Sequence, residues 1–95
     1  MTPERIERAQ QRCRAELTLG AARKRRWEYL HDLAATRGIE LDPIQVDDEL
    51  AVQRAARRLA NAGAPVHWEC LTVPTADQYL AGQTITPPPT TTRRP

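Results

Sequence analysis

Four side chains in this sequence are of the types that bind metal ions or act as nucleophiles: Cys13, His31, His67 and Cys70. His67 and Cys70 form one short pair, whereas a zinc knuckle needs two such pairs. Cys13 and His31 are far apart along the chain, about 27 Å if one continuous helix joins them, which is too far for a shared ion. The sequence therefore favours a structural cysteine and a surface histidine, and we expect no metal and no other cofactor.

Catalysis by these residues is also poorly supported. Cys70 and His67 lack an evident third group that would orient the base, and no oxyanion donor is recognisable. Glu28 and Asp32 form an acidic pair one helical turn apart, but acid–base chemistry would need a pocket that this composition rarely builds. Their simpler role is to balance Arg25 and its neighbours by local pairing. We expect a protein that is not an enzyme.

The strongest signal is a run of cations, Arg23, Lys24, Arg25 and Arg26, directly before Trp27. Four consecutive helical residues spread over about 300° of the helix, so this run cannot share one face. Arg25 and Arg26 are predicted to point outward, and Lys24 to lie nearest the apolar side. Trp27 is predicted to belong to the core.

Length and composition limit the class of protein. The 95 residues, which include no Phe, predict one small domain with a thin core, which a partner or a second copy could complete. Residues 1–37 carry nine Arg or Lys against five acids, while residues 38–80 carry three Arg against seven acids. No apolar run is long enough for a membrane-spanning helix, and the charged N-terminus lacks a signal core. The predominance of Arg and Ala suggests a GC-rich bacterial or phage genome, so we expect a cytoplasmic protein or a subunit of a particle assembled there.

The elements that must position these residues begin with a long helix over residues 3–37. Thr2 is its expected N-cap, Pro3 suits the first helical position, and Gly38 is its expected C-cap. A break into two helices near Gly20 is the alternative. The predicted apolar stripe recurs at three- and four-residue steps: Ile6, Ala9, Cys13, Leu17, Gly20, Trp27, Leu30 and Ala34.

A second helix is predicted from Pro43 to Asn61, with Asp42 as its N-cap and Gly63 after its end. Val46 and Leu50 lie on its other side and form a smaller apolar spot suited to a partner contact. The expected buried stripe is Ile44, Ala51, Val52, Ala55, Leu59 and Ala62.

The last third of the chain is predicted to be less regular. Residues 66–71 alternate in polarity, which is typical of an extended segment. Thr75 and Gln78 form a capping box that begins a short helix through Ala81, and Gly82 ends it. Residues 83–95 are rich in Pro and Thr and predict an extended tail after a helical domain of residues 1–82.

Together these elements predict an all-α fold with a long antiparallel helical hairpin. In such a hairpin, residue numbers across the pair sum to roughly 80, because the connection after Gly38 is short. Two basic segments then become neighbours, and their repulsion favours an anionic partner. The predicted partner-binding residues are Arg23, Lys24, Arg25, Arg26, Arg54, Arg57, Arg58, Val46, Leu50 and Trp68.

These residues lead to a functional hypothesis. We expect a non-catalytic adaptor or assembly subunit of a bacterial or phage complex that binds an acidic protein surface, assisted by the extended tail. A nucleic-acid-binding regulator is the alternative, since clustered cations also contact phosphates. A homo-oligomer is compatible with both, a membrane partner is not expected, and a small metal or thiol enzyme is a distant third hypothesis.

Overall fold

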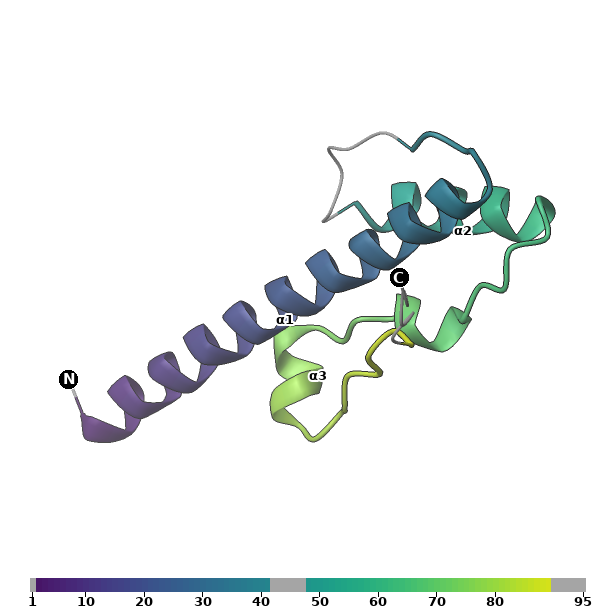
Figure 1. Ribbon diagram of the computed structural model, residues 1–95. Helices are drawn as coiled ribbons and strands as arrows, with labels where there is room; N and C mark the ends of the chain where they lie inside the picture. The colour runs from purple at the N-terminus through teal and green to yellow at the C-terminus, as the bar shows by residue number, and fades with distance from the viewer. Residues whose placement is uncertain (1, 42–47, 90–95) are drawn as a thin grey trace.

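The computed structural model describes residues 2–41 and 48–89. Within these residues it contains no strand and four helical elements: α1 (Pro3–Thr36), α2 (Glu49–Asn61), the 3-10 helix η1 (Trp68–Leu71) and α3 (Ala76–Leu80). The all-α prediction is therefore confirmed. Figure 1 shows that α1 forms the long axis of the molecule, and that the other elements gather around its second half.

α1 is a single helix that runs through Gly20 without a break, as predicted. Thr2 occupies the N-cap position with extended backbone, and Pro3 opens the first turn. The helix ends before Gly38, whose φ of +67° is most favourable for a residue without a Cβ atom. The N–H of Ile39 then donates to the carbonyl of Ala34 at 2.9 Å, which closes the end of the helix.

The face of α1 that the rest of the chain covers differs from the predicted stripe. Trp27, Leu30 and Ala34 are buried as predicted, but the earlier members Ile6, Ala9, Cys13 and Leu17 are exposed. The prediction is wrong for this first half because α2, η1 and α3 pack against a different side of the helix. The covered face is formed by Ala15, Leu19, Ala22, Arg26, Leu30 and Leu33, which recur at three- and four-residue steps.

α2 begins later than predicted. Asp48 has extended backbone, and its carboxylate accepts hydrogen bonds from the N–H groups of Leu50 and Ala51 at 3.0 and 3.1 Å, so Asp48 is the N-cap. The predictions for Asp42, Pro43, Ile44 and Val46 lie outside the described residues. Of the expected buried stripe, Val52, Ala55 and Leu59 are buried, Ala51 is half-buried, and Ala62 is exposed where the helix ends.

The two long helices do not form the predicted antiparallel hairpin. Glu49, at the start of α2, pairs with Arg26 near the middle of α1. Arg37, after the end of α1, donates to the carbonyl of Gly63, after the end of α2, at 2.9 Å. The helices therefore run in the same general direction (Figure 1).

The late start of α2 explains this direction. The chain between the ends of α1 and α2, residues 38–47, can span about 30 Å when extended. The return from Arg37 to the level of Arg26 is only about 16 Å along the helix axis. A five-residue connection closing at Asp42 would reach about 16 Å when fully extended, which leaves nothing for the sideways step from one helix to the other. The predicted cap therefore favoured a hairpin.

The core lies between the second half of α1, α2 and the segment that contains η1. Its most buried members include Leu30, Val52 and Leu59, each 0% exposed. Residues 68–71 form a 3-10 turn instead of the predicted extended segment. The reason is that the consecutive residues Cys70 and Leu71 are both buried, and an extended strand would send one of them outward.

α3 confirms the capping box. The Thr75 hydroxyl accepts from the N–H of Gln78 at 3.2 Å, and the Gln78 side chain accepts from the N–H of Thr75 at 2.9 Å. Arg12 of α1 reaches α3 by donating to Asp77 at 3.0 Å. Residues 83–89 then turn back alongside the fold without helix or strand, and Ile85 is half-buried (Figure 1). The predicted domain boundary between residues 82 and 83 stays a prediction.

Candidate partner-binding site

Arg26 lies inside the molecule, contrary to the predicted outward orientation. Its side chain is 0% exposed and stands on the covered face of α1. Nη1 donates to Glu49 Oε2 at 3.1 Å and to the carbonyl of Leu71 at 2.8 Å, while Nη2 donates to Glu49 Oε1. One guanidinium therefore ties α1 to α2 and to η1 with a bidentate ion pair and a backbone hydrogen bond. Arg26 is a structural residue and is not available to a partner.

The rest of the basic run spreads around the helix. Arg23 is half-buried, and Lys24 and Arg25 are exposed. Arg58, which the hairpin register placed beside them, instead donates to the backbone carbonyl of Glu40 at 3.2 Å, beyond the end of α1. The structure therefore does not bring the two basic segments together as a single surface, because the helices run in the same direction.

Three arginines of α2 do share one outward face. Arg54, Arg57 and Arg58 are all exposed, and the helical repeat of 100° places them within an arc of about 100°. No acidic residue follows Glu49 in α2, and the same arc includes Leu50, which is 57% exposed. We call Arg54, Arg57 and Arg58 the α2 basic face. It combines cations with one apolar side chain on a rigid helix.

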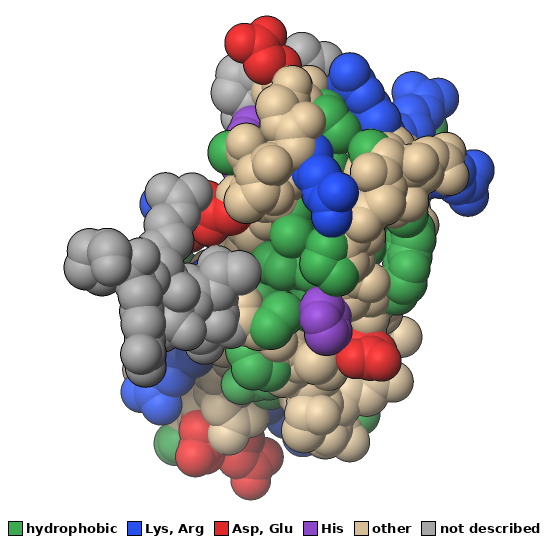
Figure 2. Space-filling model, turned by 45° about the vertical axis from the view of Figure 1, so that its right-hand side comes forward, with side chains coloured by type: hydrophobic (Ala, Val, Ile, Leu, Met, Phe, Trp, Pro, Cys, Tyr) green, Lys and Arg blue, Asp and Glu red, His purple; other side chains and the backbone are tan. Residues whose placement is uncertain are grey.

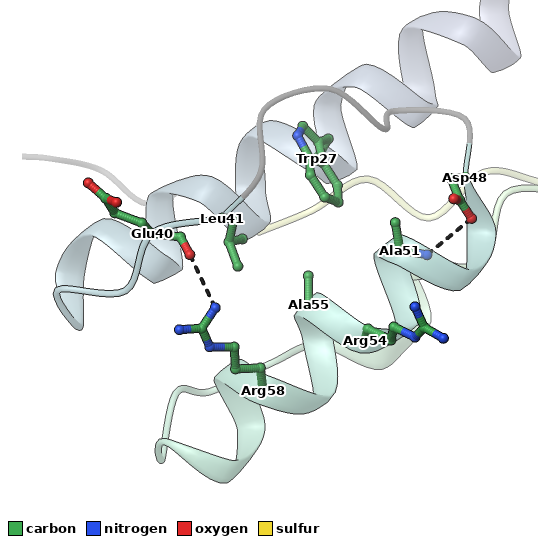
Figure 3. Close-up of a pocket in the computed structure, with 8 residues that line it drawn as sticks. All are labelled: Trp27, Glu40, Leu41, Asp48, Ala51, Arg54, Ala55 and Arg58. Atoms are coloured by element: carbon green, nitrogen blue, oxygen red, sulfur yellow. Dashed lines mark hydrogen bonds between the residues drawn. The ribbon is translucent and has the colours of Figure 1, made fainter.

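A depression borders this face between α2 and the segment after α1 (Figure 3). Trp27, Leu41, Ala51 and Ala55 supply its apolar lining. Its polar lining is mixed in charge, because Glu40 and Asp48 accompany Arg54 and Arg58. Two of the three arginines of the α2 basic face therefore also border acidic residues, whereas Arg57 is not part of this lining.

The structure describes two of the three apolar residues that were predicted to contact a partner. Leu50 is exposed, Trp68 is 48% exposed on η1, and Val46 lies outside the described residues. Figure 2 shows one face of the molecule on which Lys and Arg side chains gather at the upper right and hydrophobic side chains form a patch at the centre. Apolar and basic groups are therefore both accessible on the surface.

Residues considered for metal binding or thiol chemistry make contacts within the fold. Cys70 is buried, and its thiol donates to the backbone carbonyl of His67 at 2.9 Å. This hydrogen bond links Cys70 to the backbone of His67 and not to its imidazole. His31 packs edge-on against Trp27 with the ring centroids 5.2 Å apart. In the part of the chain that the structure describes, no group of three or more His, Cys, Asp or Glu residues could hold a metal ion.

Tyr29 is a second buried polar residue that the sequence did not single out. Its hydroxyl donates to the carbonyl of Pro65 at 3.1 Å and accepts from the N–H of His67 at 3.0 Å. These two hydrogen bonds hold the residues before η1 against α1. Burial raises the pKa of this phenol, partly opposed by the hydrogen bond from His67. Burial also raises the pKa of the Cys70 thiol.

These two groups predict a loss of stability in alkali. Both are neutral when protonated, so a pKa raised by folding means that the folded chain holds the proton more tightly than the unfolded chain. The resulting stability is complete below the ordinary pKa values of 9.0 for Cys70 and 10.0 for Tyr29 and falls as the pH rises above them. Urea unfolding at neutral and alkaline pH measures this fall. Cys70→Ala combined with Tyr29→Phe should flatten it, and an unchanged slope in that variant would contradict the assignment.

The first half of α1 is a surface that sequence reasoning assigned to the core. A signal for its exposure exists in the composition, because the later segments contain too few large apolar residues to cover a helix of 34 residues. The buried role of Arg26 had a signal as well. Ala15, Leu19, Ala22, Leu30 and Leu33 form an apolar stripe that this one cation interrupts.

Comparison with known proteins gives no family assignment: no family model matches the chain, and no curated sequence or solved structure is significantly similar to it. Among the described helices, none combines the length and the apolar character needed to cross a membrane. Functional inference therefore depends on the surfaces described above.

Proposed function

We propose that this protein is a non-catalytic adaptor or assembly subunit that binds an acidic protein surface through the α2 basic face. The observation that carries the proposal is the position of three exposed arginines within one arc of a packed helix, with no acidic residue after Glu49 in that helix. Like charges three and four residues apart on a helix are unfavourable, and an anionic partner relieves the repulsion. Arginine is also the cation best suited to planar, bidentate contacts with carboxylates.

Exposed apolar side chains favour a protein as the partner. Leu50 shares the outward arc of the α2 basic face, and Trp68 is accessible on η1. Protein interfaces combine a few apolar anchors with a polar rim, whereas phosphate contacts need only the cations. Residues 83–89 of the Pro- and Thr-rich tail lie alongside the fold, so the proposed contact does not depend on the tail.

The test is a neutral triple substitution, Arg54→Gln with Arg57→Gln and Arg58→Gln. Glutamine has nearly the helix propensity of arginine, so α2 should fold normally. Affinity capture from native cells should yield a partner at fixed stoichiometry with the unchanged chain, and the triple variant should bind that purified partner at least about tenfold more weakly. The matched control is the same substitution at Arg5, Arg8 and Arg14, three exposed arginines of α1. Equal binding by the triple variant and the control would refute this role of α2.

Binding of nucleic acid is a second candidate, favoured by the spacing of the same arginines. Residues three and four apart on a helix point to one side, where they can contact neighbouring phosphates. Fluorescence anisotropy with random duplex DNA and with random RNA separates the two functions. Binding that weakens steeply between low and moderate salt and disappears in the triple variant would support nucleic acid. Absence of such binding would leave the protein partner as the explanation of the α2 basic face.

A further inference from the structure

The first half of α1 carries an apolar stripe that no described element covers. Residues 3–14 are all exposed, and the first buried position of the helix is Ala15. Leu17 is 71% exposed and Ile6 is 45% exposed, and a shallow depression lies around Ile6, Ala9 and Cys13. We call the following residues the uncovered stripe, since the helical repeat places them within an arc of about 80°: Ile6, Ala9, Cys13, Leu17 and Gly20.

A helix in this situation is short of stabilising contacts. Isolated helices shorter than about 12–15 residues are marginal in water, and most helix stability in proteins comes from packing of an apolar face. The turns before Ala15 are attached to the packed half of α1, but their own apolar side chains are exposed. A partner that covers the uncovered stripe would supply the missing contacts.

The symmetry of the stripe favours a second copy of the chain as the partner. Its steps are three, four, four and three residues, so the pattern is the same when read from either end. An antiparallel second copy centred on Cys13 would therefore place Ile6 against Gly20 and Ala9 against Leu17. Each large side chain would meet a small one, which is the condition for close packing of two helices. We propose that the uncovered stripe is a homodimer interface in which two α1 helices pair antiparallel about Cys13.

The structure leaves room for this arrangement. A Cβ atom built on Gly20 would meet no atom within 4 Å, so the position that receives Ile6 of the second copy is open. The covered face, which includes Ala15 and Leu19, lies about 140° around the helix from the uncovered stripe. Figure 1 shows α3 on one side of α1 and the N-terminal turns extending beyond the rest of the fold. A second helix could therefore lie along the stripe without displacing α3.

The charges beside the stripe are compatible with self-association. Residues 3–17 contain four Arg and three Glu, so the segment lacks the single-sign charge that would keep two copies apart. In the antiparallel register, Arg12 of each copy approaches Glu16 of the other, and both side chains are more than half exposed. The same register brings Arg5 towards Arg23 of the second copy, a repulsion that solvent and salt screen.

This dimer would be weak, and it is independent of the α2 basic face. The contact extends over about 21 Å of one helix pair, less than a standard protein interface. We therefore expect a dissociation constant in the micromolar range. The proposed adaptor function could fail while the dimer stands, and the reverse also holds, because the two surfaces share no residue.

Sedimentation velocity of the full chain over a range of concentrations tests the dimer. We expect a reversible monomer–dimer equilibrium that Leu17→Glu weakens at least about tenfold, because each dimer buries this side chain twice. The matched control is Leu50→Glu, an exposed leucine on α2 that should leave the equilibrium unchanged. A chain that stays monomeric at every concentration, or a dimer that Leu17→Glu does not weaken, would overturn the proposal.

Oxidative cross-linking with copper phenanthroline tests the register. Cys13 should form a covalent dimer rapidly, and Cys13→Ala should not, because the remaining Cys70 is buried. In the Cys13→Ala background, chains with Ala9→Cys and chains with Leu17→Cys should cross-link only when the two are mixed. Leu50→Cys in that background measures cross-linking by random collision. Cross-linking of either stripe variant with itself above that level would indicate a parallel pair and reject the antiparallel interface.

Discussion

Glu49→Ala is expected to destabilise the folded chain by about 3 kcal/mol, because it leaves the buried Arg26 cation without its counter-charge. Arg26 is 0% exposed, whereas the Glu49 side chain is 58% exposed. Water can therefore approach the pair from one side only, which places the expected effect at the lower end of the range for buried ion pairs. Urea unfolding followed by far-UV circular dichroism measures the change.

The control for this prediction is Glu28→Ala, since Glu28 is an exposed glutamate on α1. Its substitution should change stability by less than about 0.5 kcal/mol. Glu49→Gln should fall between the two, because the amide keeps one acceptor for the guanidinium and loses the charge. The double variant Arg26→Met with Glu49→Gln should recover part of the loss, since an apolar side chain no longer needs a counter-ion. Equal effects of Glu49→Ala and Glu28→Ala would show that Arg26 does not depend on Glu49.

Leu30→Ala is expected to cost about 2–5 kcal/mol, which combines the lost burial with the cavity that remains. Leu30 is 0% exposed and belongs to the core cluster to which α1 and α2 both contribute. A domain of this size has a small total stability, so the variant should be largely unfolded at moderate temperature. Thermal and urea unfolding of the two chains provides the measurement.

Leu17→Ala is the matched control for Leu30→Ala, because the sequence places both leucines on one predicted stripe. Leu17 is 71% exposed, so its truncation should change stability by less than about 0.5 kcal/mol. The comparison must be made at a protein concentration low enough to keep the chain monomeric. Similar losses for the two leucines would mean that the first half of α1 is packed within the monomer.

Local signals in the sequence predicted several parts of the fold correctly. Pro3 and Gly38 mark the ends of α1, and Thr75 with Gln78 begins α3, because each depends on backbone groups only a few residues away. Periodicity also predicted three buried positions of α2, Val52, Ala55 and Leu59, but missed the buried Ala56. The choice between Asp42 and Asp48 as the N-cap of α2 was not, since both are acidic residues just before a helix-forming segment and only packing selects one.

The sequence alone therefore determined an all-α chain, its helix-terminating residues and its abundance of surface arginine. Only the tertiary structure decided which of two apolar stripes on α1 is covered, in which direction α2 runs, and that Arg26 lies inside. The physical reason is that helix periodicity defines faces but does not say what packs on them. A buried arginine becomes favourable only when a distant carboxylate and carbonyl, here Glu49 and Leu71, arrive to hold it.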